Sequence, residues 1–397
     1  MEAWRKIRLG DVCKTNTDSY SPKEEWDFVN YLDTGNITDN RIDSIQHIDV
    51  KSEKLPSRAR RKVKKDSIIY STVRPNQRHF GIIKTQPENF LVSTGFAVID
   101  TDAQVLDADF LYYLLTQAAL VESLHAIAEQ STSAYPSIKP SDIEDLEIEI
   151  PDLATQKKIA DILGSLDRKI TQNTEVNENL EEQLLAYYRE LFITNAKPTW
   201  KAGTVADLGN VVGGSTPSKK RDEYYTEQGI AWITPKDLSN DHSKFITRGE
   251  IDITELGLAN SSAVRMPPGT VLFSSRAPIG YIAIADGEVT TNQGFKSVVP
   301  FDEIGTAFVY CFLKENLTII ENMASGSTFK EISGSTMKVV PATIPDFETL
   351  SVFRDYADAL FNQQRCNEAE NRRLSAIRDS LLPRLMSGEL DVSDLDF

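Results

Sequence analysis

Apolar side chains recur at alternating intervals of four and three residues over positions 159–191, which is the spacing of a coiled-coil helix. The pattern continues for more than four heptads, and two asparagines occupy its middle. A single helix of this length would expose a strip of leucines to water, so the pattern predicts a partner helix. The seam residues are Ile159, Leu163, Leu166, Ile170, Asn173, Asn177, Leu180, Leu184, Tyr187 and Leu191.

The same seam returns 194 residues further along the chain, with both asparagines in register. Because a long globular segment separates the two helices, the second can begin at the far end of the first and run back along it. We therefore predict an antiparallel, intramolecular coiled coil with a pseudo-twofold axis and one globular unit at each end. The second seam consists of Phe353, Ala357, Leu360, Gln364, Asn367, Asn371, Leu374, Arg378, Leu381 and Leu385.

The four seam asparagines, Asn173, Asn177, Asn367 and Asn371, fall near the middle of the two helices. In an antiparallel pair they can meet and hydrogen-bond, which fixes the register of a coiled coil at a cost in stability. The alternative is that the seam drifts at this point and leaves the amides in solvent. The sequence alone leaves both interpretations open.

The repeat extends into the globular segments that precede the two helices. Short β-branched and aromatic runs, typical of strands, pair residues 28–32 with 230–233 and residues 67–72 with 270–275. Amphipathic patterns predict one continuous helix over 107–129 and its counterpart over 302–324.

An Ile-Pro-Asp sequence precedes each long helix, and its aspartate, Asp152 or Asp346, can cap the first turn. The chain therefore repeats a mixed α/β (α+β) domain followed by one long helix. The predicted segments are a first domain over 1–151, a helix over 152–193, a second domain over 194–345, a helix over 346–390 and a tail over 391–397. We expect the acidic residues after Gly388 to fray.

Composition bounds the possible classes of protein. A length of 397 residues with 40% hydrophobic content suffices for two or more cores. No apolar run approaches the length of a membrane span and no basic-apolar leader is seen, so we expect a cytoplasmic protein without a membrane partner. The three cysteines and four histidines are widely scattered, which predicts reduced thiols and no metal site.

Charge is unevenly distributed along this acidic chain, whose net charge is −16. Residues 57–78 contain eight basic residues and one acid, whereas residues 100–150 contain eleven acids and one lysine. A basic face of this kind attracts nucleic acid. On charge alone, a solvated strand edge guarded by lysine and arginine is an equally good interpretation.

The sequence offers no catalytic site. Residues 213–219 resemble a phosphate loop in composition, but they lack the Gly-Lys-Ser/Thr ending and contain Pro217 where a backbone amide is needed. No Asn-Pro-Pro-aromatic or Asp-Pro-Pro-aromatic tetrad is present, which argues against adenine methylation by this chain. The two Pro-Asp pairs could begin a nuclease motif, but no acid-x-lysine follows nearby, and a helix cap explains them better.

Taken in order, several motifs resemble the DNA specificity subunit of type I restriction-modification systems over essentially the full chain. These motifs are residues 4–12 and 200–208 at the domain starts, 213–218 with 231–238, 274–280 with 291–295, and the Ile-Pro helix boundaries. The resemblance implies two target-recognition domains joined by antiparallel spacer helices. Each domain would read half of a bipartite DNA site, and the helices would set the spacer.

The first domain departs from the signature of the second. It has Ser-Thr-Val-Arg-Pro at residues 71–75 where the second has Ser-Ser-Arg-Ala-Pro at 274–278, and it lacks the glycine-rich loop of residues 213–218. We therefore expect the two domains to read different half-sites, which gives an asymmetric target.

The resemblance also implies the partners of the chain, which would itself be non-catalytic and hold neither cofactor nor metal. Besides double-stranded DNA, they would be two adenine-N6 methyltransferase subunits carrying S-adenosylmethionine, which two motor-nuclease subunits using ATP and magnesium can join. Two alternatives come from other classes. A catalytic restriction-methylase would need the missing motifs, and a coiled-coil adaptor that does not bind DNA would leave the divergent domain loops unexplained.

Base reading most often uses arginine on guanine and asparagine or glutamine on adenine, whereas lysine and arginine also hold phosphates. In the first domain the base-reading candidates are Arg74, Asn76, Gln77, Arg78 and His79, and the phosphate-binding candidates are Arg58, Arg60, Arg61, Lys62 and Lys64. In the second domain the candidates are Thr216, Lys219, Lys220, Arg221, Lys236, Ser275, Arg276, Asn292 and Gln293. For Arg276 and Asn292, which lie in shared motifs, the alternative is a scaffold role within the domain.

Overall fold

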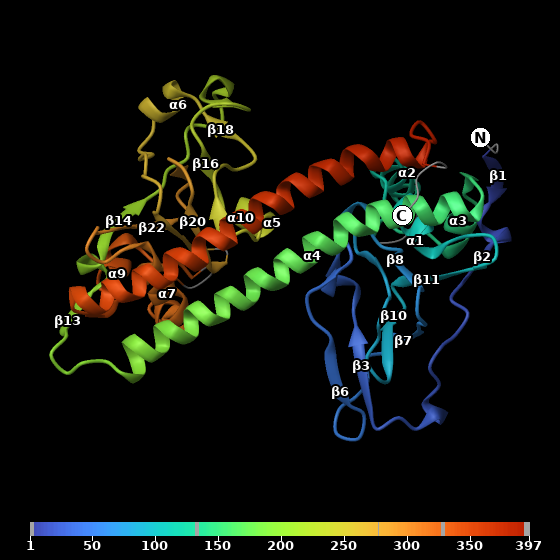
Figure 1. Cartoon of the computed structure of the whole chain (residues 1–397), viewed down its shortest axis with the longest axis horizontal. Helices are drawn as coiled ribbons and strands as arrows, with labels where there is room; N and C mark the ends of the chain where they lie inside the picture. Colours follow the sequence, from blue (N-terminus) through green and yellow to red (C-terminus); the bar gives the residue numbers. More distant parts are fainter. Residues whose placement is uncertain (1–3, 132–134, 277, 327–329, 393–397) are drawn as a thin grey trace. The chain divides into compact units, whose positions relative to one another are not determined.

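The computed structural model describes residues 4–131, 135–276, 278–326 and 330–392 (Figure 1). The chain divides into two compact units, of which the first comprises Met1–Ile170 with Arg373–Phe397 and the second comprises Thr171–Arg372. Each unit contains one globular domain and parts of two long helices, α4 (Leu153–Arg189) and α10 (Phe347–Met386). Wider, π-type turns continue α4 over Glu190–Thr194.

The first domain is a mixed α/β structure in which most strands precede the helices. Its helices are α1 (Ala108–Leu115), α2 (Ala118–Glu129) and α3 (Pro140–Glu144). Its strands are β1 (Arg5–Arg8), β2 (Cys13–Thr15), β3 (Phe28–Leu32), β4 (Ile37–Thr38), β5 (Arg41–Ile42), β6 (Gln46–Asp49), β7 (Ala59–Lys62), β8 (Ile68–Ser71), β9 (Phe80–Ile82), β10 (Phe90–Ser93), β11 (Phe96–Thr101) and β12 (Glu147–Ile150).

Two four-stranded sheets form the body of this domain, in the orders β2-β11-β8-β9 and β6-β3-β10-β7 (Figure 1). The first sheet is antiparallel, whereas β3 and β10 at the centre of the second are parallel. Residues Ile68 and Tyr70 of β8 pack with α1 and α2, and the opposite face, which includes Ile69, packs against β3 and β10. Because β8 is covered on both faces, its sequence is continuously apolar instead of alternating.

The second domain repeats this plan. Its helices are α5 (Pro235–Asn240), α6 (Glu255–Ala259), α7 (Thr306–Glu315), α8 (Leu317–Asn322) and α9 (Gly334–Lys338). Its strands are β13 (Lys201–Thr204), β14 (Gly209–Gly213), β15 (Tyr225–Thr226), β16 (Trp232–Ile233), β17 (Phe245–Ile246), β18 (Asp252–Ile253), β19 (Val271–Ser275), β20 (Ile279–Ala285), β21 (Thr290–Thr291), β22 (Lys296–Pro300) and β23 (Pro341–Ile344).

The strand orders of the two domains correspond. In the five-stranded sheet, the strands β14-β22-β19-β20 correspond to β2-β11-β8-β9 of the first domain. The parallel pair β16 and β21 corresponds to β3 and β10, and the pair β13 and β23 corresponds to β1 and β12. The correspondence extends to single hydrogen bonds. The N–H of Thr72 donates to the carbonyl of Gly95 at 2.8 Å, and that of Ser275 donates to Gly294 at 2.7 Å. The repeat predicted from the sequence is therefore confirmed.

In each unit the two long helices run antiparallel to each other. In the first unit Ile159 and Leu163, near the start of α4, share a core with Leu385 near the end of α10. In the second unit Leu184, near the end of α4, shares a core with Phe353 near the start of α10. This is the antiparallel arrangement that the two seams predict.

The seam asparagines meet within the second unit. Asn173 donates to Asn371 Oδ1 at 2.9 Å, and Asn367 donates to Asn177 Oδ1 at 2.8 Å. The side chain of Gln364 adds a bond of 2.9 Å to the carbonyl of Asn177, and that of Asn177 donates back to the Gln364 carbonyl at 3.3 Å. Asn173 and Asn367 are buried. The amides are therefore paired across the helices instead of facing solvent.

The helix caps lie where the Pro-Asp sequences predict them. Asp152 accepts the N–H groups of Ala154 at 2.9 Å and Thr155 at 3.1 Å, and Asp346 accepts the N–H of Thr349 at 2.9 Å. Each carboxylate also accepts a hydrogen bond from the hydroxyl of its threonine, Thr155 for Asp152 and Thr349 for Asp346. These bonds satisfy backbone donors that the first turn of a helix leaves free.

The expected continuous helices over 107–129 and 302–324 are wrong. The first is two helices, α1 and α2, bent by 66°, and the second is α7 and α8, which begin only at Thr306. Asn316 ends α7 because its backbone leaves the helical region and its side chain bonds the carbonyl of Phe312 at 2.8 Å. Among the described residues no single helix is long and apolar enough to cross a membrane, and the α1–α2 pair meets that test only when both are counted together.

The expected fraying of the tail is wrong as far as the structure describes it, and residues 393–397 lie outside the described part. Gly388 has a φ of 72°, which ends α10 and turns the chain back. Val392 is then buried and Leu390 partly buried against the core of the first unit.

Candidate nucleic-acid interface

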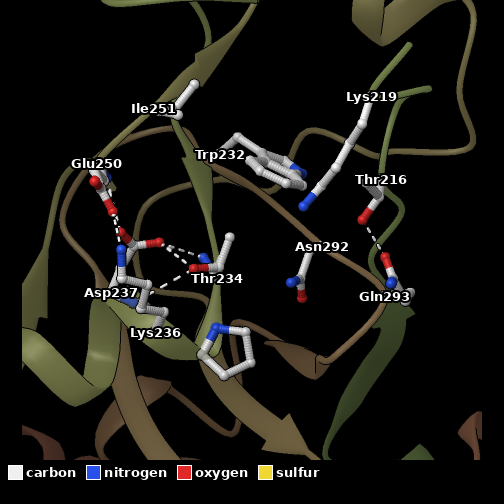
Figure 2. A pocket seen from close by; sticks show the side chains of 11 residues that line it. Thr216, Lys219, Trp232, Thr234, Lys236, Asp237, Glu250, Ile251, Asn292 and Gln293 are labelled. Atoms are coloured by element: carbon white, nitrogen blue, oxygen red, sulfur yellow. Dashed lines mark hydrogen bonds and ion pairs between the residues drawn. The ribbon is translucent and has the colours of Figure 1, made fainter.

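The second domain has a pocket at the carboxyl ends of β16 and β21 (Figure 2). Because these strands are parallel, the residues that follow both of them meet at one edge. The loop after β14 completes the wall, since the N–H of Ser215 bonds the carbonyl of Thr291 at 2.9 Å. The pocket has a volume of about 340 Å³ and is lined by Thr216, Lys219, Trp232, Thr234, Pro235, Lys236, Asp237, Glu250, Ile251, Asn292 and Gln293.

A capped helix start forms the floor of the pocket. Thr234 is the N-cap of α5, and Pro235 occupies the first turn, where a missing N–H costs nothing. The carboxylate of Asp237 accepts the N–H of Thr234 at 2.7 Å, its hydroxyl at 2.6 Å and the N–H of Glu250 at 2.8 Å. Both oxygens of Asp237 are therefore used inside the domain.

Two glycines permit the close backbone contacts around this pocket. A Cβ on Gly214 would lie 1.9 Å from the carbonyl oxygen of Asn292, and one on Gly249 would lie 2.7 Å from that of Trp232. In contrast, a Cβ on Gly213 would meet nothing closer than 3.9 Å. The glycine-rich loop is thus a packing device that holds residues 214–219 against β21, which agrees with the argument against a phosphate loop.

Trp232 gives the pocket an aromatic wall. Its indole N–H donates to the carbonyl of Ser215 at 3.0 Å, and its ring meets that of Tyr225 edge-on at a centroid distance of 5.8 Å. The hydroxyl of Tyr225 bonds the carbonyl of Pro217 at 2.6 Å. The orientation of the tryptophan is therefore fixed by the same loop that carries Thr216 and Lys219.

The structure brings together five of the nine residues predicted in this domain, namely Thr216, Lys219, Lys236, Asn292 and Gln293. Lys220 and Arg221 are exposed on the adjoining turn outside the lining, and Arg221 lies 3.1 Å from Glu223. Arg276 is half-exposed, 3.7 Å from Glu331.

The prediction that Ser275 contacts DNA is corrected by its burial. Its side chain is fully buried, and its hydroxyl donates to the carbonyl of Gly294 at 3.0 Å. The residue ends a buried strand, so its polar group serves the neighbouring loop. Four further lining residues were not predicted from the sequence, namely Trp232, Thr234, Asp237 and Glu250. The first three lie in the motif at residues 231–238, whereas no sequence signal pointed to Glu250.

The first domain has the same strand-end edge with different side chains. Asp33 follows β3 and Ser93 ends β10, and these strands are parallel. The Asp33 carboxylate accepts the N–H of Thr34 at 2.8 Å. Burial raises the pKa of this carboxyl, but the bond from Thr34, side-chain bonds from Ser93 and Tyr31, and nearby Arg58 outweigh it, so the pKa is lowered overall.

The predicted phosphate-binding residues of the first domain lie on β7 and around it. Arg58 and Arg60 are exposed, and Arg61 is half-buried. Lys62 lies 2.5 Å from Glu24, and Lys64 lies 3.5 Å from Asp100. Both lysines are thus paired with acids of their own domain.

The predicted base-reading residues of the first domain are split by their contacts. Arg74 has a φ of 48° and starts an exposed turn that includes Asn76 and Gln77. Arg78 instead donates to Asp39 at 2.7 Å, and His79 Nδ1 lies 2.6 Å from the carbonyl of Ile37. Arg74, Asn76 and Gln77 are therefore the members of this group that remain available to an external ligand.

A buried charged network attaches the second domain to the helix pair within the second unit. Glu181 of α4 accepts hydrogen bonds from Lys244, from Lys314 at 2.7 Å and from the hydroxyl of Tyr310 at 2.8 Å. Lys244 also donates to the side chain of Gln364 on α10 at 2.6 Å. One lysine thus bonds both helices.

Burial sets the energetics of this network. It would raise the pKa of Glu181, but Lys244 and Lys314 outweigh it and lower that pKa to about 2. Burial lowers the pKa of Lys244 in spite of Glu181. Glu368 of α10 accepts the N–H of Lys244 at 2.8 Å, yet burial raises its pKa. Removing one member would leave the others charged and uncompensated.

The first unit has a smaller and more exposed counterpart. Asp167 of α4 accepts the hydroxyl of Tyr113 at 2.6 Å and the guanidinium of Arg378 on α10 at 2.7 Å. Arg378 also lies 2.8 Å from Asp379. Arg378 and Asp167 each keep about a third of their side chain exposed, so solvent screens this pair.

Comparison with known proteins gives one consistent result. The family described as "Type I restriction modification DNA specificity domain" matches residues 1–182 and 197–378. The HindI specificity subunit of Haemophilus influenzae is 26% identical over 98% of this chain and 100% of its own length. The MjaIX specificity subunit of Methanocaldococcus jannaschii is 39% identical over 46% of this chain and 43% of its own.

A solved structure supports the fold. The type I restriction-modification S subunit from M. genitalium aligns over 96% of both chains with a TM-score of 0.55 at 18% identity. Two matches to the specificity-domain family, one for each copy of the repeat, agree with the two similar domains and the two paired helices described above. The chain belongs to the type I restriction-modification DNA specificity family.

Proposed function

We propose that the two domains read different halves of an asymmetric, bipartite sequence in double-stranded DNA. The observation that carries this proposal is that one strand-end edge recurs in both domains with different side chains, Asp33 and Ser93 in one and Thr234 and Asn292 in the other. Members of the specificity family are non-catalytic, and we propose that the chain directs adenine-N6 methyltransferase subunits to the site.

The paired asparagines support a ruler role for the helix pair. Their cross-helix bonds stabilise one register, and the register determines how far apart the two half-sites lie. Inserting one matched heptad in α4 and in α10 would preserve the seam and lengthen the pair by about 10 Å. The spacer should then grow by about three base pairs while both half-sites stay unchanged. An unchanged spacer would contradict the ruler.

Protein partners need an apolar surface, and one lies on the helices of the first unit. A groove of about 610 Å³ is lined by Asp161, Ile162, Ser165, Arg168, Leu381, Leu385, Leu390, Asp391 and Val392. We propose that a methyltransferase subunit, which would carry S-adenosylmethionine, docks there. Two such subunits, and two motor-nuclease subunits that use ATP and magnesium, would complete the assembly.

The test of the proposed function is a map of methylated adenines, by single-molecule sequencing, in cells with and without this chain. The proposal predicts a bipartite, asymmetric motif that is methylated only when the chain is present. Methylation that depends on the chain but follows no sequence motif would contradict the proposal, and so would a symmetric motif. The variant Ile162→Glu tests the docking site, since it should abolish methylation while DNA retention by the purified chain persists.

A further inference from the structure

The pocket of the second domain offers unpaired hydrogen-bond donors, while its two carboxylates are already paired within the domain. The carboxylate of Asp237 is held by Thr234 and Glu250, and the carboxylate of Glu250 lies 2.7 Å from Lys236. Among the described residues the ammonium of Lys219 has no partner, and this residue and Trp232 line the same pocket (Figure 2). A ligand that supplies hydrogen-bond acceptors therefore suits the unpaired donors of this pocket.

The orientation of Asn292 is fixed by the backbone. The N–H of Gly294 donates to its Oδ1 at 2.8 Å, and only the carbonyl end of an amide can accept that bond. Its NH₂ group has no partner among the described residues and lines the pocket (Figure 2). Asn292 therefore presents donors and has its acceptor oxygen engaged.

Gln293 does not share this constraint. Its amide oxygen pairs with the hydroxyl of Thr216, which can either donate or accept. Gln293 can consequently turn either end of its amide outward. The discriminating groups of the pocket are thus Asn292 and Lys219.

The four bases differ in the acceptors that they present in the major groove. Guanine offers two acceptors, N7 and O6, whereas adenine offers the N7 acceptor beside an N6 donor. The usual asparagine–adenine pair needs both the oxygen and the NH₂ group of the amide turned toward the base, whereas the Gly294 N–H holds the oxygen of Asn292 toward the backbone. An N6 donor would face the donors of Asn292 without a partner, and an unpaired buried donor is costly.

A phosphate would also accept these hydrogen bonds, but the walls favour a base. Trp232, Pro235 and Ile251 give the pocket flat, apolar surfaces that suit the edge and face of a base. Asn292 is half-buried and held by a backbone bond, which is the preorganisation that base reading requires.

We infer that this pocket reads a guanine, through its N7 and O6, in the half-site of the second domain. The inference rests on the proposed function and adds to it the identity of a base. It also reverses the expectation for Asn292 that follows from the usual pairing of asparagine with adenine.

The experiment uses the full chain assembled with its methyltransferase subunits and DNA selected from a randomised pool. The wild-type assembly should select a half-site with an invariant guanine. Replacing that guanine by 7-deazaguanine, which lacks N7, should weaken binding about tenfold or more. Inosine, which keeps N7 and O6, should leave binding almost unchanged. Because these arms use the wild-type chain, they do not depend on the folding of a variant.

Variants supply the protein side of the test. Asn292→Asp keeps the acceptor for Gly294 and removes the donors, so it should abolish the preference for guanine at one position. Lys219→Gln should weaken that preference, whereas Lys220→Gln, which makes the same charge change outside the lining, should not. Equal weakening on all sequences by Asn292→Asp and Lys219→Gln would assign the pocket to phosphate and overturn the inference.

The two proposals can fail separately. A wild-type assembly that selects no sequence at all would contradict the proposed function. A selected bipartite motif in which neither half responds to 7-deazaguanine, or in which neither half responds to the pocket variants, would overturn the guanine inference alone.

Discussion

The two domains share a scaffold at their strand-end edges and differ in the chemistry placed on it. In both domains a glycine packs tightly at this edge. A Cβ on Gly95 would lie 2.8 Å from the side chain of Thr34, and a Cβ on Gly294 would lie 2.9 Å from that of Pro235. Beside this glycine the first domain places the hydroxyl of Ser93, which accepts the Gly95 N–H at 3.3 Å, whereas the second places the amide of Asn292, which accepts the Gly294 N–H at 2.8 Å. At the neighbouring strand end the first domain has Asp33 where the second has Thr234. The comparison teaches that backbone packing can stay constant while a few side chains change what is read.

The attachment of the domains to the helices differs as well. Glu181 holds two lysines in a buried network in the second unit, whereas Asp167 and Arg378 form a half-exposed pair in the first. Buried charges depend strongly on one another, and exposed ones do not. The second unit should therefore be the more sensitive of the two to loss of a single charge.

The largest expected effect is that of Glu181→Gln. It leaves Lys244 buried without its carboxylate and should lower the free energy of unfolding of the second unit by about 3 to 5 kcal/mol. The matched change in the first unit, Asp167→Asn, should cost about 1 kcal/mol. Hydrogen exchange of α7 and of α1 would report the two units separately. Equal decreases in the free energy of unfolding of the two units would contradict the expected difference between them.

The charge of Glu181 also predicts a pH dependence. Its pKa is lowered from the ordinary 4.5 to about 2, so the ionised carboxylate stabilises the second unit above about pH 4.5. That contribution is lost as the pH falls from 4.5 toward 2. The stability difference between wild type and Glu181→Gln should therefore narrow over this range in urea titrations, while exposed Glu182→Gln should track the wild type throughout. A constant difference would contradict the assignment.

A smaller effect on stability, with a large effect on one half-site, is expected from Gly214→Ala. The added Cβ would collide with the carbonyl of Asn292, and overpacking of this kind costs about 1 to 3 kcal/mol. Recognition of the half-site read by the second domain should fall, whereas that of the other half-site should persist. Gly213→Ala has space and should behave as the wild type in both melting and DNA-selection assays. Equal behaviour of the two variants would argue against the loop packing.

The smallest effect is expected from Asp33→Asn, which replaces an acceptor by a donor in the first domain. Base preference should change about tenfold at one position of the first half-site, since a good base contact discriminates by that order. The second half-site should be unaffected. Asp27→Asn, at the opposite end of β3 and exposed, is the control. A change in the second half-site would show that the domains do not read independently.

The helix pair could be predicted from the sequence because a heptad repeat is a local signal and its partner carried the same signal. The caps at Asp152 and Asp346 were equally local. The breaks at α1–α2 and α7–α8 could not be predicted, since both halves of each keep an apolar face toward the core. Burial of Ser275 was hidden as well, because a carbonyl from a distant turn satisfies its hydroxyl.

Only some of the residues that line the pocket were predicted from the sequence as DNA-binding candidates. Lys219 and Asn292 were candidates because of their residue types, and the structure places both in one lining. Glu250 joins them through two tertiary bonds, one from its N–H to Asp237 and one from Lys236 to its carboxylate. The bond from the Gly294 N–H to the oxygen of Asn292 likewise appears only in the folded structure, although it decides which bases Asn292 can pair with.

The central claim is that the two domains read different half-sites through the same edge. The most direct measurement is a methylation-motif map of the assembly with wild-type chain, with Asp33→Asn and with Asn292→Asp. The account predicts that each variant alters one position of the bipartite motif, that the two positions lie in different halves, and that the spacer stays constant. Changes by both variants in the same half, or an unaltered motif with either variant, would contradict it.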